Sequence, residues 1–268
     1  MFDAARQPGT PPRRATVLVF AGLDPSGGAG LAADIMAIHA MGAHALPVAT
    51  ALTVQDNNRV YDVHPVAPAL VHSQASALLE RLAIDAVKIG IPGSAANARV
   101  IAELIGRLRQ AAPHLPVVLD PVLASGGGDV LSADDALDAL QPLLPLVTLI
   151  LPNLPEARAL TDAGLTPAVQ AERLRARGCQ HVLITGGHAD GTLVVNRWFG
   201  PGVQHDWSLP RLAGAFHGSG CTLAAAVAAR LAQADTMALA LGSALAYSHQ
   251  ALAGAYAVGP GQLIPRRC

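Results

Sequence analysis

One short segment, residues 215–230, combines a glycine-flanked turn, a thiol and the start of an alanine-rich helical pattern. The turn consists of Gly218, Ser219 and Gly220, and Cys221 stands where the helical pattern begins. The first N–H groups of a helix lack intrahelical partners and attract an anion, and the same helix end lowers the pKa of a thiol by favouring the thiolate. The segment therefore predicts an anion site beside an activated sulfur. The structural alternative is a small buried cysteine that only fills space.

A second group of polar residues stands at the ends of predicted strands. Asp24, Gln55, Asp120, Asn153 and Glu156 each follow a short apolar run, and glycine is frequent around them. In an open α/β sheet, ligands bind beyond the carboxyl ends of the strands. A single acid at such a position is usually a turn former or a helix cap, but polar residues at several strand ends predict a small-molecule site.

The types of these residues indicate phosphoryl transfer. Asp120, Asn153 and Glu156 offer oxygen atoms that can organise Mg²⁺ through water molecules. Gln55 offers one acceptor and two donors, which suits the edge of a heteroaromatic ring. The Gly-Ser-Gly-Cys turn offers backbone donors to a phosphate, although the chain has no G-x-x-x-x-G-K-[ST] motif and only a poor match to G-x-G-x-x-G. We therefore expect a nucleotide to donate phosphate to a small hydroxyl compound.

The segments that must position these residues alternate between strand and helix patterns. Strands are predicted at residues 15–22, 45–54, 59–66, 85–90, 115–122, 147–153 and 181–188, followed by a hairpin over 191–199 and 203–210. Helices are predicted between the first glycine-rich loop and Gly42, and at 68–82, 94–110, 132–144, 154–160, 167–177, 219–233 and 235–253. This alternation predicts an α/β fold, with a mostly parallel central sheet and helices on both faces.

The chain of 268 residues suits one large α/β domain. No linker or change of composition divides it, so we expect a disordered tail at residues 1–15 and a single domain at 16–268. We also expect residues 259–268 to be loosely held.

Charge and cysteine content exclude several classes of protein. The formal net charge of −1 argues against general attraction to nucleic acid or to an acidic membrane. Three widely spaced cysteines without a C-x-x-C pair indicate neither a disulfide framework nor a zinc site, so the cytoplasm is the expected compartment. The first residues contain no apolar signal-peptide region, and polar residues interrupt the apolar stretch at 222–246, which predicts two core helices and no membrane span.

Seven short motifs occur in one order between residues 16 and 230: AGLDPSGGAGLAADI, TALTVQDN, VKIG, VLDPV, LPNLPEA, TGGH and HGSGCTLAAAVAA. In this combination they resemble the hydroxymethylpyrimidine and phosphomethylpyrimidine kinases of thiamine synthesis, which belong to the ribokinase superfamily. The resemblance implies a ribokinase-like fold, ATP and Mg²⁺ as cofactors, and a homodimer. It implies phosphorylation of 4-amino-5-hydroxymethyl-2-methylpyrimidine and then of its monophosphate.

The resemblance also implies roles for individual positions in the pyrimidine pocket and the anion hole. The pyrimidine pocket corresponds to Gly22, Asp24, Ala29, Gln55 and Val122. Within it, Gln55 would read the aminopyrimidine edge. The anion hole over the transferred phosphoryl group corresponds to Gly218, Ser219 and Gly220, and the catalytic base to Cys221.

On the nucleotide side, the implied residues are Asp120, Asn153, Glu156, Thr185 and Gly187. Asp120 and Glu156 would hold Mg²⁺ through water, and Thr185 would lie near the ATP phosphates.

The sequence departs from the family pattern at three positions. Thr185 and Gly126 stand where lysines are expected, and Ile91 replaces a methionine. The lost charge near a triphosphate predicts weaker nucleotide binding or compensation by another cation. The candidates for compensation are Arg197, His188 and Arg211.

Two other functions fit the same residues. Pyridoxal kinases are close relatives with a similar glycine–cysteine element, so pyridoxal is an alternative substrate. The missing lysines motivate an alternative of another class, a pyrimidine-binding protein with little kinase activity. Outside the implied site, we expect His188 and His217 to be solvated loop residues and Lys88 to be a buried strand lysine paired with a carboxylate.

Overall fold

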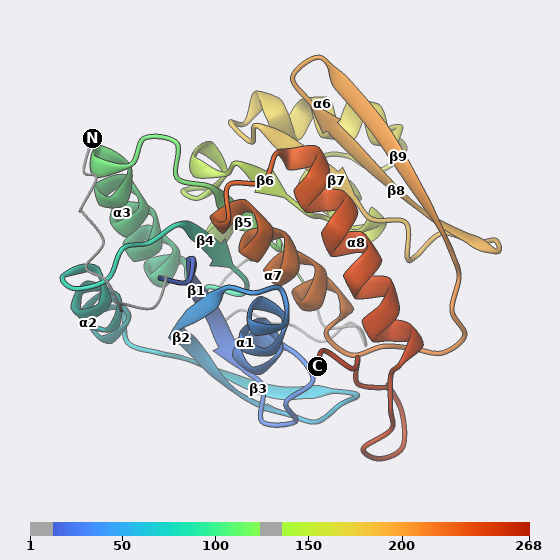
Figure 1. Ribbon diagram of the computed structural model, residues 1–268, viewed down its shortest axis with the longest axis horizontal. Coiled ribbons are helices and arrows are strands. Elements are labelled where there is room, and N and C mark those ends of the chain that lie inside the picture. The colour runs from blue at the N-terminus through green and yellow to red at the C-terminus, as the bar shows by residue number, and fades with distance from the viewer. Residues whose placement is uncertain (1–12, 124–135) are drawn as a thin grey trace, which may run out of the picture.

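The strand and helix patterns form one nine-stranded sheet with helices packed on both faces (Figure 1). The computed structural model describes residues 13–123 and 136–268. Its strands are β1 (Thr16–Leu23), β2 (His44–Gln55), β3 (Val60–Pro65), β4 (Ala86–Ile89), β5 (Val117–Leu119), β6 (Leu149–Ile150), β7 (His181–Ile184), β8 (Leu193–Gly200) and β9 (Val203–Pro210). Its helices are α1 (Gly30–Ala40), α2 (Pro68–Leu79), α3 (Ala95–Ala111), α4 (Ala136–Leu140), α5 (Leu154–Leu160), α6 (Pro167–Ala176), α7 (Ser219–Ala232) and α8 (Met237–Ala253), with a 3-10 turn at Leu144–Leu146.

The sheet is parallel in its centre and antiparallel at its two ends. The strand order is β3-β2-β1-β4-β5-β6-β7-β8-β9. All neighbours from β2 to β7 pair in parallel, whereas β3, β8 and β9 pair antiparallel with their neighbours. Parallel strands need crossover connections, and these bring the carboxyl ends of the central strands to one edge of the sheet. The predicted mostly parallel α/β fold is confirmed.

Strand β1 shows why both faces of the sheet are covered. Val17 and Val19 belong to the cluster formed with α1, α7 and α8, while Leu18 and Phe20 belong to the cluster formed with α2 and α3. All four side chains are fully buried. Because side chains alternate across a strand, a strand that is apolar at every position requires helices on both sides.

Helices α7 and α8 account for the apolar stretch near the end of the sequence. The buried residues of α7 are mostly alanine, and such small side chains allow the helix to lie close to the sheet, α1 and α8. The two predicted core helices are therefore confirmed. In the part of the chain that the structure describes, no helix is both long and apolar enough to cross a membrane.

The central strands end earlier than the sequence pattern predicted. Strand β5 ends at Leu119 and β6 at Ile150. Pro121 and Pro152 follow shortly afterwards, and proline has no N–H to donate to the ladder. The polar residues around these prolines are therefore left at the edge of the sheet. The predicted start of a helix at residue 132 lies outside the described residues, and α4 covers Ala136–Leu140.

The prediction of a loosely held segment at residues 259–268 is wrong. Ile264 and Arg267 are each 2% exposed. Backbone bridges pair Tyr256 with Ile264 and Phe216 with Leu263. The residues that cover this segment lie far from it in the sequence, so no local pattern announces its burial. We refer to residues 255–267 as the C-terminal strap.

Candidate active site

The carboxyl ends of the parallel strands open into a cavity of about 900 Å³. The first turn of α7, the end of β2 and the loops after β1, β4, β5, β6 and β7 contribute to its wall. The predicted site residues on that wall are Gly22, Ala29, Gln55, Asp120, Val122, Asn153, Glu156, Thr185, Gly187, Gly218, Ser219, Gly220 and Cys221. The fold thus brings residues from most of the chain into one site, and of the predicted set only Asp24 is not part of the wall.

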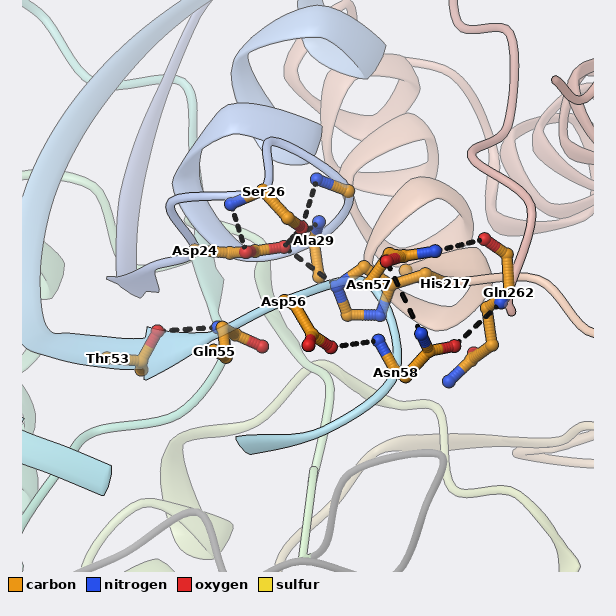
Figure 2. Close-up of polar contacts among 12 residues, drawn as sticks. Asp24, Ser26, Ala29, Thr53, Gln55, Asp56, Asn57, Asn58, His217 and Gln262 are labelled. Atoms are coloured by element: carbon orange, nitrogen blue, oxygen red, sulfur yellow. Dashed lines mark hydrogen bonds and ion pairs between the residues drawn. The ribbon is translucent and has the colours of Figure 1, made fainter. Parts of the chain in front are cut away.

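Asp24 is buried outside the set of cavity-lining residues. It holds the glycine-rich loop that follows β1 (Figure 2). Its carboxylate accepts hydrogen bonds from the Ser26 amide at 2.8 Å, the Ser26 hydroxyl at 2.9 Å and the Ala29 amide at 2.7 Å. Burial raises the pKa of Asp24, but the hydrogen bonds from His217 and Ser26 outweigh it and the pKa is lowered. Asp24 therefore orders the loop, and its predicted contact with substrate stays a prediction.

His217 is the partner of Asp24 that sequence reasoning missed. Its Nε2 lies 2.8 Å from Asp24 Oδ2, and its side chain is only 13% exposed, so the prediction of a solvated histidine is wrong. His217 directly precedes the glycine turn at the start of α7. Its place directly before that turn is the sequence feature that could have indicated a role for His217 at the site. The contact ties the loop after β1 to the turn before α7.

Gln55 is oriented by its neighbours at the end of β2 (Figure 2). Its side-chain amide donates to the Thr53 hydroxyl at 2.6 Å, and Thr53 donates to the carbonyl of Leu23 at 2.8 Å. Because Leu23 belongs to β1, the sheet itself fixes the amide on the cavity wall. A side-chain amide held in this way can read the polar edge of a ring.

Gly218 occupies a backbone position that requires glycine. Its φ is +76°, and a Cβ there would lie 2.1 Å from the carbonyl oxygen of Gly28. Glycine adopts such left-handed conformations without steric cost. Gly218 is the N-cap of α7, so the helix begins on the cavity wall, where its first amides are available to an anion.

The pKa of the Cys221 thiol is higher than its position at the start of a helix predicts. Burial raises the pKa of Cys221 to about 12, while the charge of Lys88 lowers it and the charge of Asp120 raises it. The free protein therefore holds a thiol at neutral pH, and the predicted lowering of the pKa is wrong. Burial raises the pKa of Asp120 to about 6, and a hydrogen bond from Cys221 acts in the other direction. Asp120 is thus largely ionised at neutral pH and in contact with the thiol.

Lys88 is the only lysine in the chain, and it lies on the cavity wall. Its ammonium is 2.8 Å from Asp34 Oδ2 on α1, and both side chains are 0% exposed. Burial lowers the pKa of Lys88, but the charges of Asp34 and Asp120 and the hydrogen bond to Asp34 outweigh it at neutral pH, and the pKa is raised. The predicted pairing of Lys88 with a carboxylate is confirmed, and it keeps a positive charge beside Cys221.

Asn153 and Glu156 serve α5 as well as the cavity. The Asn153 side chain accepts from the Glu156 amide and the Glu156 side chain accepts from the Asn153 amide, both at 2.9 Å, which forms a capping box. Burial and then the charge of Asp120 raise the pKa of Glu156 to about 8. The pair Asn153 and Glu156, which the sequence predicts to bind ligand, therefore also caps the first turn of α5.

Asp120 and Glu156 fit a divalent cation. Asp120 Oδ2 is buried without a hydrogen-bond partner among the described residues. A cation held through water would supply a bridging water as a donor to this oxygen, and its charge would favour the charged form of both carboxyl groups. Within residues 13–123 and 136–268, no cluster of three or more histidine, cysteine, aspartate or glutamate side chains could hold a metal. Water or phosphate oxygens would therefore have to complete the coordination.

The loop after β7 forms the side of the cavity where the resemblance implies nucleotide phosphates. Thr185 and Gly187 lie on this wall. Arg211 donates to the carbonyls of Gly187 at 2.8 Å, Ala189 at 2.5 Å and Gly191 at 2.7 Å, so it orders the loop.

Two of the three candidates for the missing positive charge line the cavity. These are His188 and Arg211, whereas Arg197 is not on the wall and lies 3.4 Å from Asp206. Gly126, the other position where a lysine was expected, lies outside the described residues.

Comparisons with known proteins identify relatives over most of the sequence. The sequence profile of the family described as phosphomethylpyrimidine kinase matches residues 24–265. The hydroxymethylpyrimidine/phosphomethylpyrimidine kinase of Mycobacterium tuberculosis is 39% identical over 262 residues, which cover 94% of this chain and 92% of that protein. The protein of the same name from Escherichia coli is 37% identical over 227 residues, covering 81% and 83%. The thiamine biosynthesis bifunctional protein of Geobacter sulfurreducens is 36% identical over 254 residues, and the match covers 92% of this chain but only 51% of that protein.

Solved structures show the same fold. The pyridoxal kinase of Bacillus subtilis in an ADP complex has a TM-score of 0.85 at 25% identity, covering 95% of this chain and 97% of that one. The phosphomethylpyrimidine kinase of Clostridium difficile has a TM-score of 0.76 at 29% identity, covering 89% and 99%. The predicted ribokinase-like architecture is thereby confirmed.

Proposed function

The chain belongs to the phosphomethylpyrimidine kinase family, and we propose that it transfers the γ-phosphoryl group of ATP to 4-amino-5-hydroxymethyl-2-methylpyrimidine and then to the resulting monophosphate, in the biosynthesis of thiamine. One observation carries the proposal. A single cavity has Gln55 on its wall together with the N-terminus of α7, Cys221 and two buried carboxyl groups. It thus combines a group that can read a heteroaromatic edge with groups that can receive phosphate and a proton.

The pyrimidine binds, in this proposal, between the loop after β1 and the end of β2. Gly22, Ala29, Gln55 and Val122 form this part of the wall. A Cβ at Gly22 would lie 2.6 Å from the Ile91 side chain. The absence of a side chain at Gly22 therefore lets Ile91 approach the backbone and leaves a narrow apolar surface for a ring.

Phosphoryl transfer then needs positioning, charge stabilisation and a proton acceptor. The substrate hydroxyl oxygen forms a bond to the γ-phosphorus, and the bond from that phosphorus to the bridging oxygen breaks, so ADP leaves. Amides at the start of α7, those of Ser219 and Gly220, receive the charge of the transferred group. The hydroxyl proton passes to Cys221, whose own proton passes to Asp120. The pKa values of about 12 and about 6 support this order, because only Asp120 is ionised at neutral pH.

Mg²⁺ would be held through water by Asp120 and Glu156, the pair with raised pKa values. When bound, the ion neutralises charge on the phosphates. Coordination through water leaves the Asp120 carboxylate able to exchange a proton with Cys221.

We also propose that two copies of the chain associate through the outer part of β1 and β2. Leu23, Leu52 and Val54 are 43%, 50% and 50% exposed, and Leu23 pairs with Leu52 in the sheet. A second copy would remove this apolar surface from water. Sedimentation of the chain and of Leu52→Asp tests this, with a dimer expected for the first and a monomer for the second. A monomeric parent chain would contradict it.

Pyridoxal is the second candidate substrate. It is supported by the likeness to the Bacillus subtilis pyridoxal kinase, whose TM-score is 0.85. The pyrimidine is preferred because the family profile and the curated relatives carry that name over most of the chain.

An ADP-release assay with Mg·ATP tests the function. Hydroxymethylpyrimidine, its monophosphate and pyridoxal are compared on one preparation, with Cys221→Ala as the control for contaminating kinases. We expect turnover of both pyrimidines that is lost in the variant. Turnover of pyridoxal alone would favour the second candidate. No turnover of any of the three would refute the proposed kinase activity.

A further inference from the structure

The C-terminal strap inserts an arginine beneath the anion hole. Arg267 Nη2 donates to the carbonyl of Gly28 at 2.5 Å and to the carbonyl of Gly218 at 3.3 Å. Its Nε donates to the Thr222 hydroxyl at 2.9 Å. The side chain is buried, since Arg267 is 2% exposed. One guanidinium therefore joins the loop after β1, the turn before α7 and the first turn of α7.

The strap that carries Arg267 is itself held on both sides. The Leu263 amide donates to the Ala215 carbonyl at 2.8 Å, and the His217 amide donates to the Leu263 carbonyl at 2.9 Å. Asn57, at the turn between β2 and β3, donates to the Gln262 carbonyl at 2.9 Å (Figure 2). The strap thus runs between the turn after β2 and the segment that leads into α7.

The far end of the strap is fixed to α8. The Tyr247 hydroxyl donates to the carbonyl of Arg267 at 2.9 Å, and the Arg266 amide donates to the carbonyl of Ala251 at 2.9 Å. The backbone of Arg267 is therefore fixed independently of its side chain. Loss of the guanidinium alone should leave the strap in place.

The geometry of the peptide unit links Arg267 to the amides of the site. In a trans peptide the C=O and the N–H point in opposite directions, and the described residues contain no cis peptide. Arg267 holds the Gly28 carbonyl, so the next amide, that of Ala29, points away from it. This amide donates instead to Asp24 Oδ2, at 2.7 Å.

The same argument applies at Gly218. Its carbonyl accepts hydrogen bonds from the Thr222 amide at 3.0 Å and the Thr222 hydroxyl at 2.8 Å as well as from Arg267. With the carbonyl held on that side, the Ser219 amide is turned away from Arg267, and Ser219 lies on the cavity wall. Charge-assisted hydrogen bonds are stronger than neutral ones, so the guanidinium is well suited to fix these planes.

We propose that Arg267 is a positioning residue for the anion hole: it fixes the peptide planes before Ala29 and Ser219 and thereby presets the amide that meets the transferred phosphoryl group. The inference deepens the kinase function proposed above and rests on it. Arg267 itself does not line the cavity, so it acts through the backbone and not by touching substrate.

Three variants of the full chain test the proposal in the ADP-release assay. Arg267→Met keeps most of the side-chain volume but removes every donor. We expect kcat to fall about 10- to 100-fold, as for a catalytic group displaced by about an ångström, with KM for the pyrimidine little changed. Arg267→Lys keeps the charge and a single donor nitrogen in place of the planar guanidinium fork, and it should recover part of the loss.

The matched control is Arg266→Met, the same change one residue earlier at an exposed side chain. It should keep the kcat of the parent chain. Equal kcat values for Arg267→Met and Arg266→Met would overturn the proposal.

Amide hydrogen exchange over residues 215–222 separates this proposal from the kinase function. We expect faster exchange there in Arg267→Met than in Arg266→Met, with α3 on the other face of the sheet unchanged. If the parent chain turns over none of the substrates, the proposed function fails and exchange alone decides the positioning role. Unchanged exchange with normal parent turnover rejects the positioning role and leaves the function intact.

A fourth variant, at Thr222, covers the case in which Arg267→Met does not fold at the assay temperature. Thr222→Val removes the hydroxyl that accepts from Arg267 Nε and donates to the Gly218 carbonyl. A lower kcat and faster exchange over residues 215–222 support the proposal. Parent-like values of both reject it.

Discussion

Replacing Lys88 by methionine should reveal how much the fold depends on its buried ion pair. Lys88 and Asp34 are both 0% exposed, with 2.8 Å between Nζ and Oδ2. Asp34 Oδ1 has no hydrogen-bond partner among the described residues, so Lys88 is the group that favours the charged carboxylate. At this separation two unit charges attract each other by about 6 kcal/mol in an effective dielectric of about 20. Without that attraction, protonation of Asp34 is the less costly state of the variant.

Protonation of Asp34 determines how much Lys88→Met lowers the free energy of unfolding. The ordinary pKa of Asp34 is 3.8, and burial raises it in the folded protein. At pH 7 the unfolded chain ionises Asp34, whereas burial without the Lys88 charge favours the neutral carboxyl in the folded variant. Keeping the carboxyl neutral costs about 1.4 kcal/mol for each pH unit above the unfolded pKa, which sets an upper limit of about 4 kcal/mol at pH 7. This value agrees with the about 3–5 kcal/mol expected when one partner of a buried pair is removed.

The sign of the pH dependence follows from the same linkage. In Lys88→Met the folded pKa of Asp34 lies above the unfolded one. The raised pKa contributes stability that is fully present below the unfolded pKa of Asp34 and is lost as the pH rises through the folded pKa. Urea unfolding should therefore show the cost of Lys88→Met shrinking by about 1.4 kcal/mol per pH unit as the pH falls from about 7 to about 5. A cost that does not change with pH would refute the reasoning.

A double variant and an exposed pair provide the controls. Lys88→Met with Asp34→Leu removes both charges and should be within about 1 kcal/mol of the parent, because apolar replacement of a buried pair is often neutral. Losses that simply add would show that the two charges do not interact. Arg173→Met breaks an exposed pair with Asp162 and should cost less than about 1 kcal/mol. Since Lys88 is the only lysine, lysine-selective ¹⁵N labelling gives one ammonium resonance that reports its charge directly.

Further variants test the site itself. Cys221→Ala should lower kcat about 10²- to 10⁴-fold while pyrimidine affinity stays nearly constant, because the residue acts in proton transfer; a near-normal kcat would exclude it as the proton acceptor. Gln55→Ala should raise KM for the pyrimidine by leaving a ring edge unpaired, and unchanged selectivity between pyrimidine and pyridoxal would count against that role. Glu156 holds a cation only when ionised, so the apparent Mg²⁺ affinity of the parent should rise with pH up to its pKa of about 8 and then level off. Glu156→Gln should weaken Mg²⁺ binding and flatten that profile, and a retained pH dependence would assign it to another group. Gly218→Ala should destabilise the fold by at least about 1–2 kcal/mol, because φ is +76° and the new Cβ would lie 2.1 Å from the Gly28 oxygen; an unchanged Tm would contradict this.

Most elements of the fold could be predicted because their signals are local. Apolar runs and helical patterns alternate along the chain, and this alternation alone indicates a parallel sheet with crossover helices. Gly42 closes α1 with a φ of +87°, as the pattern predicted. The sequence pattern extends β5 and β6 too far, because the prolines that end the ladder closely follow the apolar runs. The burial of the C-terminal strap could not be predicted, because its partners are supplied by distant segments.

Local patterns along the chain are enough to place the chemical groups of the site at the carboxyl edge of the sheet, because strand ends and helix starts are local features. What each group does there depends on contacts between segments that are far apart in the chain. His217 meets Asp24 across 193 positions and Arg267 meets Gly28 across 239 positions, and such contacts depend on how the helices and the sheet pack together. The pKa of Cys221 shows the same division. The start of a helix favours a thiolate, but burial raises the pKa to about 12. Removing a thiolate from water costs more free energy than its interaction with the helix end contributes.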